Sequence, residues 1–142
     1  MIRIASVAAA LLLTAAPAFA QSADNKVVLT FETGARTGMV MVALYDSASA
    51  FDGGSARPVA ATAVSASGSR VVATFENLPA GDYAMKAFHD VNGDGEMNTN
   101  PFGMPTEPYA FSNNAVGNMG PARWDRAHFA VSGETAQTIS IR

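Results

Sequence analysis

The sequence contains no cysteine and has no excess of basic residues, and these absences exclude several classes of protein. Without cysteine the chain has no disulfide framework, no thiolate metal site and no thiol nucleophile. Nine Lys and Arg against twelve Asp and Glu give a formal charge of -3. Nucleic acid is therefore not expected as a partner, because its binding depends on Lys and Arg that neutralise phosphates. A chain of 142 residues with this composition is expected to form one globular domain.

The chain begins with a segment that is typical of a secretory signal. Arg3 supplies a positive charge, an apolar run follows, and Ala18-Phe19-Ala20 forms a small-residue cleavage site. A membrane-spanning helix would need about 20 uninterrupted apolar residues, and Pro17 interrupts this run. We therefore expect residues 1–20 to be removed. The remaining residues 21–142 would form a single domain in the periplasm or outside the cell, with no membrane span.

Seven short segments after the signal have the pattern of β-strands. They are residues 26–33, 39–46, 58–65, 70–76, 82–88, 127–131 and 135–141. Residues 39–46 are apolar on both faces, as expected of a central strand that is covered on both sides. No long helix is predicted, although residues 47–52 have the length for one turn. The pattern predicts an all-β fold, an antiparallel immunoglobulin-like or prealbumin-like β-sandwich of about seven strands.

The strand pattern disappears between residues 90 and 126, where Asn, Gly and Pro are frequent. Loops longer than about 15 residues are uncommon in compact domains and are usually functional or disordered. Four aromatic residues in this segment argue against disorder: Phe102, Tyr109, Phe111 and Trp124. We expect the segment to fold back over one end of the sandwich and to hold the functional site.

The start of this segment has the spacing of a calcium-binding loop. Residues 89–98 read HDVNGDGEMN and contain D-x-N-x-D-G, the first half of the helix-loop-helix calcium motif. Oxygens at alternate positions of a tight loop converge on one point, and Ca²⁺ takes about six to eight oxygens. The pattern predicts calcium ligands at five positions: Asp90, Asn92, Asp94, the carbonyl of Glu96, and Asn98.

The second half of the calcium motif is missing. The position that normally holds a bidentate glutamate falls on Pro101, so another carboxylate must take part, with Glu96, Glu107 and Asp125 as the candidates. We expect weak binding, with a Kd of about 10⁻⁴ to 10⁻³ M. Two alternatives stay open at this point. The loop is either a plain turn, since Asn, Asp and Gly favour turns without an ion, or a site for Mg²⁺ or another hard cation.

The aromatic residues of the segment indicate a second kind of site. Aromatic rings stack on sugar faces or fill apolar pockets, and asparagine side chains beside them supply hydrogen bonds. We predict a surface for a glycan or a peptide, formed by Tyr109, Phe111, Asn113, Asn114 and Trp124. In the alternative interpretation, these rings attach the long segment to the sandwich core.

Catalytic chemistry has little support in the sequence. Neither G-x-S-x-G nor H-E-x-x-H occurs, and the chain has two histidines, His89 and His128. A small periplasmic hydrolase with His89, Asp90 and His128 in a cleft is kept as an alternative. The acidic residues are better explained by a cation than by acid and base chemistry, so we assign no catalytic residue.

Four motifs occur in order along the chain. They are F-x-x-L-P-x-G-x-Y at residues 75–83, H-D-x-N-G-D-G at 89–95, F-G-x-P-x-E at 102–107 and F-S-N-N-A at 111–115. The first resembles a strand corner of prealbumin-like and immunoglobulin-like sandwiches. Together they resemble a family of small secreted bacterial proteins catalogued as a domain of unknown function, over roughly residues 75–129. The resemblance implies export and a sandwich domain but no activity. We therefore predict an exported, non-enzymatic module whose calcium loop orders an adjacent binding loop.

Overall fold

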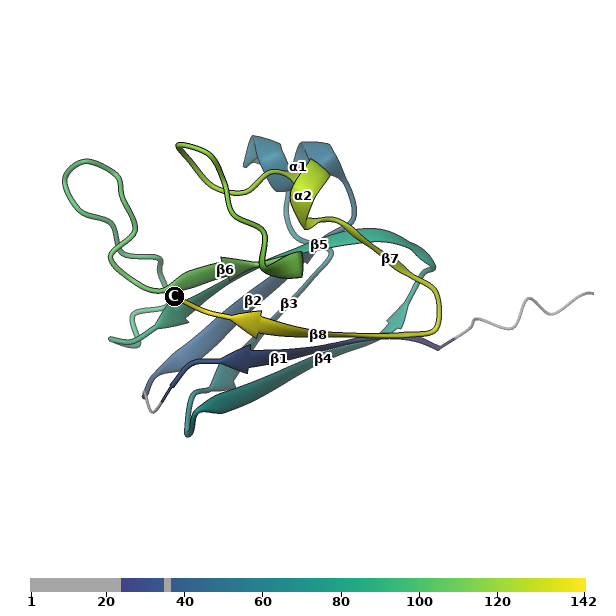
Figure 1. Ribbon diagram of the computed structural model, residues 1–142, viewed down its shortest axis with the longest axis horizontal. Helices are drawn as coiled ribbons and strands as arrows, with labels where there is room; N and C mark the ends of the chain where they lie inside the picture. Colours follow the sequence, from purple (N-terminus) through teal and green to yellow (C-terminus); the bar gives the residue numbers. More distant parts are fainter. Residues whose placement is uncertain (1–23, 35–36) are drawn as a thin grey trace, which may run out of the picture.

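Two β-sheets packed face to face form the body of the protein (Figure 1). The computed structural model describes residues 24–34 and 37–142, so the predicted signal segment lies outside the described residues. The strands are β1 (Asn25–Glu32), β2 (Met39–Tyr45), β3 (Ala60–Ser65), β4 (Arg70–Leu78), β5 (Gly81–Asp90), β6 (Tyr109–Phe111), β7 (Phe129–Val131) and β8 (Glu134–Ser140). Three short helices accompany them: α1 (Ala48–Gly53), the 3-10 helix η1 (Ser112–Asn114) and α2 (Trp124–Ala127). The predicted all-β sandwich is confirmed.

One pair of strands departs from the predicted antiparallel arrangement. The smaller sheet has the order β4-β1-β8, and the larger has the order β3-β2-β5-β6, with β7 also pairing with β5. The first and last strands, β1 and β8, run parallel, with Val27 opposite Thr135. The expectation of an entirely antiparallel sandwich is therefore wrong at this pair. Parallel neighbours need a long connection between them, and here almost the whole domain supplies it.

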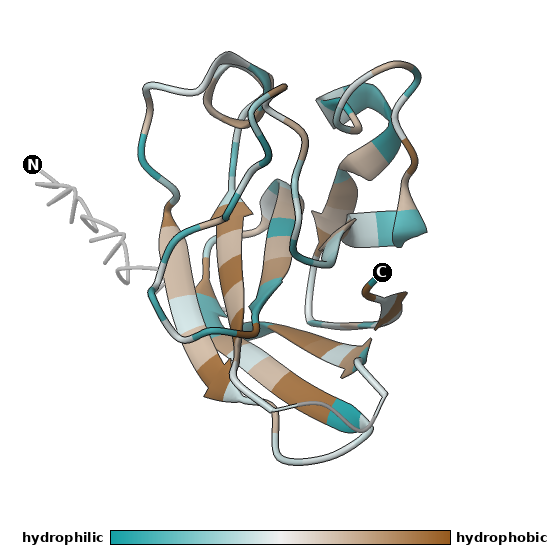
Figure 2. Ribbon diagram, turned by 90° about the vertical axis from the view of Figure 1, so that its left-hand side faces the viewer, coloured by the Kyte–Doolittle hydropathy of each residue, from teal (hydrophilic) through white to brown (hydrophobic). Residues whose placement is uncertain are grey.

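The core lies between the two sheets and follows the period-two alternation of the strands. The core includes Val27, Leu29 and Phe31 from β1, and Val40, Val42 and Leu44 from β2. Burying one such side chain contributes about 1.5–3 kcal/mol. Hydrophobic bands along the strands of both sheets are visible in Figure 2. A second cluster, centred on Phe51 of α1 and Phe111 at the end of β6, attaches the helices to the larger sheet.

The corner predicted at residues 75–83 carries the chain from one sheet to the other. β4 ends at Leu78 and β5 begins at Gly81, and the Tyr83 hydroxyl donates to the Pro79 carbonyl at 2.8 Å. Desolvation, with a further contribution from the Asp46 carboxylate, raises the pKa of Tyr83. The phenol therefore stays a hydrogen-bond donor and fixes the turn.

Two predictions about the chain are corrected. The long segment from residue 90 to 126 contains a strand, β6, besides η1 and most of α2. The interpretation of β2 as covered on both faces is wrong, because Met41, Ala43 and Tyr45 on its outer face remain partly exposed. No helix in the described part of the chain is long and apolar enough to cross a membrane.

Candidate functional site

The predicted calcium loop begins where β5 ends. Successive residues of a strand point to opposite faces, so His89 points into the sandwich and Asp90 away from it. The His89 ring is fully buried, and its Nε2 lies 2.6 Å from the carbonyl oxygen of Thr37. Because a carbonyl oxygen can only accept, Nε2 is the donor. His89 therefore closes the end of the core and does not face the loop.

The carboxylate of Asp90 organises the turn that follows it. Its Oδ1 accepts from the main-chain N–H of Gly93 at 2.7 Å and of Asp94 at 3.2 Å, and its Oδ2 accepts from Gly95 at 2.8 Å. Asp90 is 2 % exposed, so these bonds replace its hydration. Gly93 and Gly95 have φ of 76° and 81°, a left-handed backbone that glycine adopts without strain. The spacing of the motif thus follows from the winding of main-chain N–H groups around Asp90.

Three side chains at the outer side of the loop meet at one point. Oδ2 of Asp94 accepts from Nδ2 of Asn92 at 3.0 Å and from Nδ2 of Asn98 at 2.8 Å. The bond from Asn98, followed by the main-chain N–H of Glu96, lowers the pKa of Asp94; desolvation raises it in part, and Asn92 lowers it further. Asp94 is therefore held as a carboxylate among carboxamides.

Glu107, one of the three carboxylates considered as a replacement, lies against the loop. Its Oε1 accepts from Val91 N at 3.0 Å and its Oε2 accepts from Asn98 N at 3.2 Å, so one carboxylate ties both ends of the loop together. Glu107 is buried, whereas the side chain of Glu96 is exposed. The third candidate, Asp125, lies in α2, which packs against α1 and η1.

The oxygen atoms of the loop are of the chemical types that bind a hard cation. Carboxylate, carboxamide and carbonyl oxygens are the ligands that Ca²⁺ prefers, and the loop offers them at alternate positions. Within the described ranges, no three side chains of His, Cys, Asp or Glu gather closely enough to hold a metal by themselves. Any cation here would depend on Asn92, Asn98 and main-chain carbonyls for the rest of its ligands.

The predicted ligand-binding asparagines have partners within the chain. The Asn114 side chain donates to the Thr138 carbonyl at 2.9 Å and accepts from Ser140 N at 2.8 Å. The Asn113 side chain donates to the carbonyls of Arg126 at 3.1 Å and His128 at 2.9 Å. The two amides therefore attach η1 to β8 and to the α2–β7 junction.

The predicted aromatic residues are divided between two places. Tyr109 and Phe111 of β6 line open hollows, whereas Trp124 packs edge-on against Phe51 at 6.1 Å and stacks on His128 at 5.6 Å. Trp124 therefore follows the alternative interpretation given above, in which the ring attaches the long segment to the body of the protein, here at the second hydrophobic cluster. The hydrolase residues are not brought together, because His89 faces the core while His128 stacks on Trp124 beside α2.

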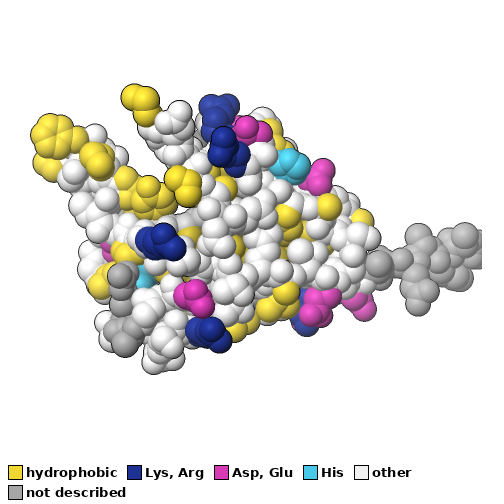
Figure 3. Space-filling model, in the orientation of Figure 1, with side chains coloured by type: hydrophobic (Ala, Val, Ile, Leu, Met, Phe, Trp, Pro, Cys, Tyr) yellow, Lys and Arg dark blue, Asp and Glu magenta, His cyan; other side chains and the backbone are white. Residues whose placement is uncertain are grey.

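A large apolar groove, which we did not predict from the sequence, lies on the outer face of the larger sheet. It has a volume of about 1160 Å³. The outer side chains of β2, β3, β5 and β6 form its floor, and Met97, residues 103–105 and residues 119–121 contribute to its walls. Hydrophobic side chains gather on two protruding loops at the upper left of Figure 3, with a notch between them. The apolar outer face of β2 was the sequence signal for this groove.

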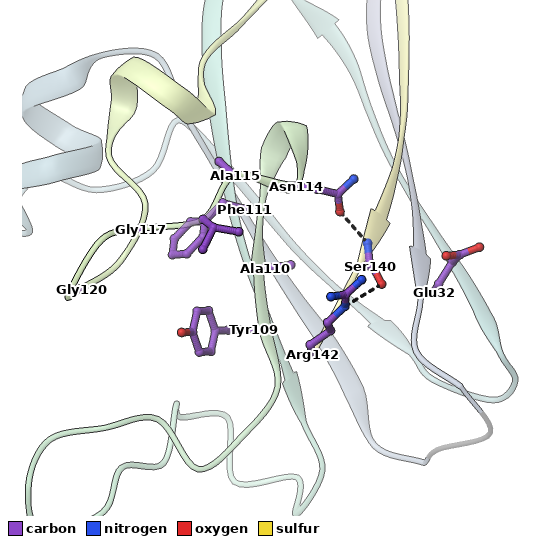
Figure 4. A pocket seen from close by; sticks show the side chains of 11 residues that line it. Glu32, Tyr109, Ala110, Phe111, Asn114, Ala115, Gly117, Gly120, Ser140 and Arg142 are labelled. Carbon is purple, nitrogen blue, oxygen red and sulfur yellow. Dashed lines mark hydrogen bonds between the residues drawn. The ribbon is translucent and has the colours of Figure 1, made fainter.

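A smaller hollow of about 560 Å³ lies where β6 approaches β8. In Figure 4 the rings of Tyr109 and Phe111 stand on one side of it, and Arg142 and Ser140 on the other. Asn114 lies at its edge, bonded to Ser140. This hollow therefore has an apolar side and a polar side, unlike the apolar groove.

The fold and the site define a class of protein, a two-sheet β-sandwich with a wound Asp/Asn loop beside an open apolar groove. A family model matches residues 32–140, that of DUF2141, described as "Uncharacterized protein conserved in bacteria". The match covers most of the chain, and the chain belongs to this family. Neither the curated proteins nor the solved structures contained a match. Membership of a family of unknown function is confirmed, whereas secretion stays a prediction.

Proposed function

We propose that this protein is an exported, non-enzymatic binding module whose loop at residues 90–98 takes up Ca²⁺ weakly and thereby orders the segment beside the apolar groove. The observation that carries the proposal is the convergence of Asn92, Asp94 and Asn98 within hydrogen-bond distance of one another. The two carboxamides now donate their N–H groups, and rotation of these amides beside the Asp94 carboxylate would turn their oxygens toward one cation. The proposed ligands are those predicted from the spacing: Asp90, Asn92, Asp94, the Glu96 carbonyl and Asn98.

The proposed cation would act on the groove through the distal part of the loop. The carbonyl of Asn98 accepts from Thr106 N at 2.9 Å, and Thr99 pairs with Pro105. The tip between them contributes Gly103, Met104 and Pro105 to the groove. A cation held at Asn98 would restrict this tip, which has few apolar contacts of its own.

Thermal unfolding across micromolar to ten-millimolar Ca²⁺, with Mg²⁺ as the control ion, tests the proposal. A ligand that binds only the native state stabilises it by about 2.7 kcal/mol at a hundredfold excess over Kd. We expect a calcium-selective rise in Tm. Asp94→Asn should abolish the rise while Glu96→Gln retains it, because only the Glu96 carbonyl is a proposed ligand. Asp90→Ala is unsuitable, since it also removes three main-chain bonds.

Two outcomes would contradict this assignment. The first is a Tm that does not change up to ten-millimolar Ca²⁺, which would reduce the loop to a turn held by Asp90. The second is an equal loss of the calcium response in Asp94→Asn and Glu96→Gln. That result would indicate a diffuse attraction to the acidic surface instead of a site.

Recognition of a glycan or a peptide is the second candidate. It is favoured by Tyr109 and Phe111, which line both hollows, and by the mixed polar lining of the smaller one. Quenching or enhancement of Trp124 fluorescence by a panel of glycans and peptides tests it, because Trp124 contacts the same Phe51 cluster as Phe111. A flat response across the panel would count against it.

A further inference from the structure

We propose that the apolar groove binds a single-chain anionic amphiphile, such as a long-chain fatty acid, with its head group at Lys86 and its tail along the outer face of β2. The proposal goes beyond the calcium loop and does not require it, because the floor of the groove is built from strands. It rests on three observations: the composition of the floor, the position of one charge and the exposure of the walls.

The floor of the groove is an apolar sheet face with no layer over it. Met41 and Ala43 of β2, Ala61 and Ala63 of β3, and Phe88 of β5 provide the surface. Sheet faces that meet water normally alternate apolar inward with polar outward residues, and this one is apolar on both sides. The alanines leave room close to the sheet for a slender chain. An extended hydrocarbon matches this shape better than a sugar, which would need polar partners.

Lys86 is the one charged side chain among the described residues that line the groove. Its Nζ donates to the Phe51 carbonyl at 2.5 Å and lies over the rings of Tyr45 at 5.1 Å and Phe51 at 4.6 Å. Burial lowers the pKa of Lys86, and the Asp52 carboxylate raises it in part. An ammonium group has three donors, so donors remain for an anion after the bond to Phe51. Charge complementarity therefore selects one anionic group at this position.

The charge lies toward the Tyr45 side of the groove floor, whereas the wall formed by Met97 and residues 103–105 belongs to the loop that follows the other end of β5. In the register of β2 and β5, Lys86 is opposite Ala43, beside Tyr45, whereas Phe88 is opposite Met41 near the calcium loop. Met97 and Met104 of the loop that follows β5 also line the groove. Methionine is flexible and polarizable, and it adapts to ligands of variable shape. One charged end followed by an apolar channel is the pattern of an amphiphile.

The walls carry apolar side chains that are exposed in the protein. Met119 is 102 % exposed and Met104 is 63 %, and Phe102, which precedes the lining residues 103–105 in the same loop, is 89 % exposed. Exposed apolar patches beside a groove usually mark a binding surface. The two protruding loops that carry these residues stand on either side of a notch (Figure 3). A concave site of this kind favours a small ligand over a second copy of the chain, which would need a flat, accessible sheet face.

Titration calorimetry with three probes of equal tail length tests the proposal. The probes are dodecanoate, dodecanol and dodecyltrimethylammonium, each below its micellar concentration, with the purified full chain. We expect dodecanoate to bind, dodecanol to bind more weakly and the cationic probe to bind weakest. Lys86→Met should weaken dodecanoate about tenfold or more and leave dodecanol unchanged, because a charged hydrogen bond is lost only from the former.

A matched pair of variants locates the tail. Ala63→Glu places a charge on the groove floor opposite Met41 and should abolish binding of all three probes. Ala136→Glu makes the same change at an exposed position of β8 in the other sheet and should leave binding unchanged. Circular dichroism verifies that both variants fold.

Three results would overturn the proposal. The first is equal binding of the three probes, which would remove the role of Lys86, and the second is binding of none of them. The third is a dimer, observed by light scattering, that the Ala63→Glu substitution dissociates and that added dodecanoate does not. That result would make the groove an interface between two copies of the chain. Each titration is run in chelator and in Ca²⁺. If Ca²⁺ does not raise Tm while dodecanoate still binds, the result would contradict the proposed calcium site and leave the groove proposal standing.

Discussion

The side chain of Ser112 takes the place of a strand partner for Met85. Met85 N donates to the Ser112 hydroxyl at 2.8 Å, and that hydroxyl donates to the Ala127 carbonyl at 2.5 Å. On the same edge of β5, β7 pairs with residues 81–83 and β6 pairs with residues 86–88. One buried hydroxyl therefore bridges the break between two short strands that share an edge.

Replacement of this hydroxyl should destabilise the domain. Ser112→Ala leaves the buried Met85 N–H and Ala127 carbonyl without partners, and we expect a loss of about 1–3 kcal/mol in the free energy of unfolding. Chemical denaturation measures the change, with Ser132→Ala at an exposed turn position as the control. Equal stability of the two variants would show that water or a neighbouring group replaces the hydroxyl.

Asn114 should matter for stability more than for ligand binding. Its φ is 50°, and its amide makes two bonds to the main chain of β8. Asn114→Gly removes the bonds and also the Cβ from a left-handed backbone, whereas Asn114→Ala removes the same bonds and keeps a Cβ there, at a cost of about 1–2 kcal/mol relative to Gly. We expect Tm to fall in the order wild type, Gly, Ala. Asn118→Ala in the exposed loop is the control. If the two Asn114 variants have the same Tm as this control, Asn114 would again be a candidate ligand-binding residue.

The stability contributed by Asp94 should depend on pH in the acid range. Because folding lowers its pKa below the ordinary 3.8, the carboxylate stabilises the native state above that pH, and the contribution is lost as the pH falls through the lower native value. We expect the Tm advantage of wild type over Asp94→Asn, measured without calcium, to disappear on acidification below the ordinary value. An advantage that persists in acid would mean that the charge of Asp94 is not its source.

Gly38 should not tolerate a side chain. Its φ is 95°, and a Cβ there would overlap the carbonyl oxygen of Asp90. Gly38→Ala should cost about 1–3 kcal/mol from overpacking in addition to backbone strain, and it should weaken any calcium response by displacing Asp90. Gly133→Ala is the control, because Gly133 has φ of 84° but no atom within 4 Å of its Cβ position. Equal losses at the two glycines would show that backbone strain alone is responsible.

Period-two alternation was enough to predict the sandwich and the approximate position of seven strands. It did not predict β6, because three residues between Pro108 and Ser112 are too short to show a period. The parallel pairing of β1 with β8 was missed for another reason. Local sequence shows which face of a strand is apolar, but not which distant strand lies beside it.

Some features of the candidate site could be predicted from the sequence and others could not. The winding of the loop around Asp90 follows from local spacing, and Asn92, Asp94 and Asn98 do meet as the spacing indicates. The role of Glu107 depends on how the chain returns to the loop, so the sequence offered it only as one of three candidates. The bonds of Asn113 and Asn114 join distant segments, and no short-range pattern reveals them.

The parallel pairing of β1 with β8 constrains the order in which the chain assembles. β1 lies in the middle of the smaller sheet and needs β8 on one side, yet β8 is synthesised after the seven other strands that the structure describes. Pairing residues so distant in sequence imposes a large loop-closure entropy and slows folding. The smaller sheet therefore stays incomplete while the chain is being made, and loss of even the final turn and strand would expose the edge of β1 to other chains.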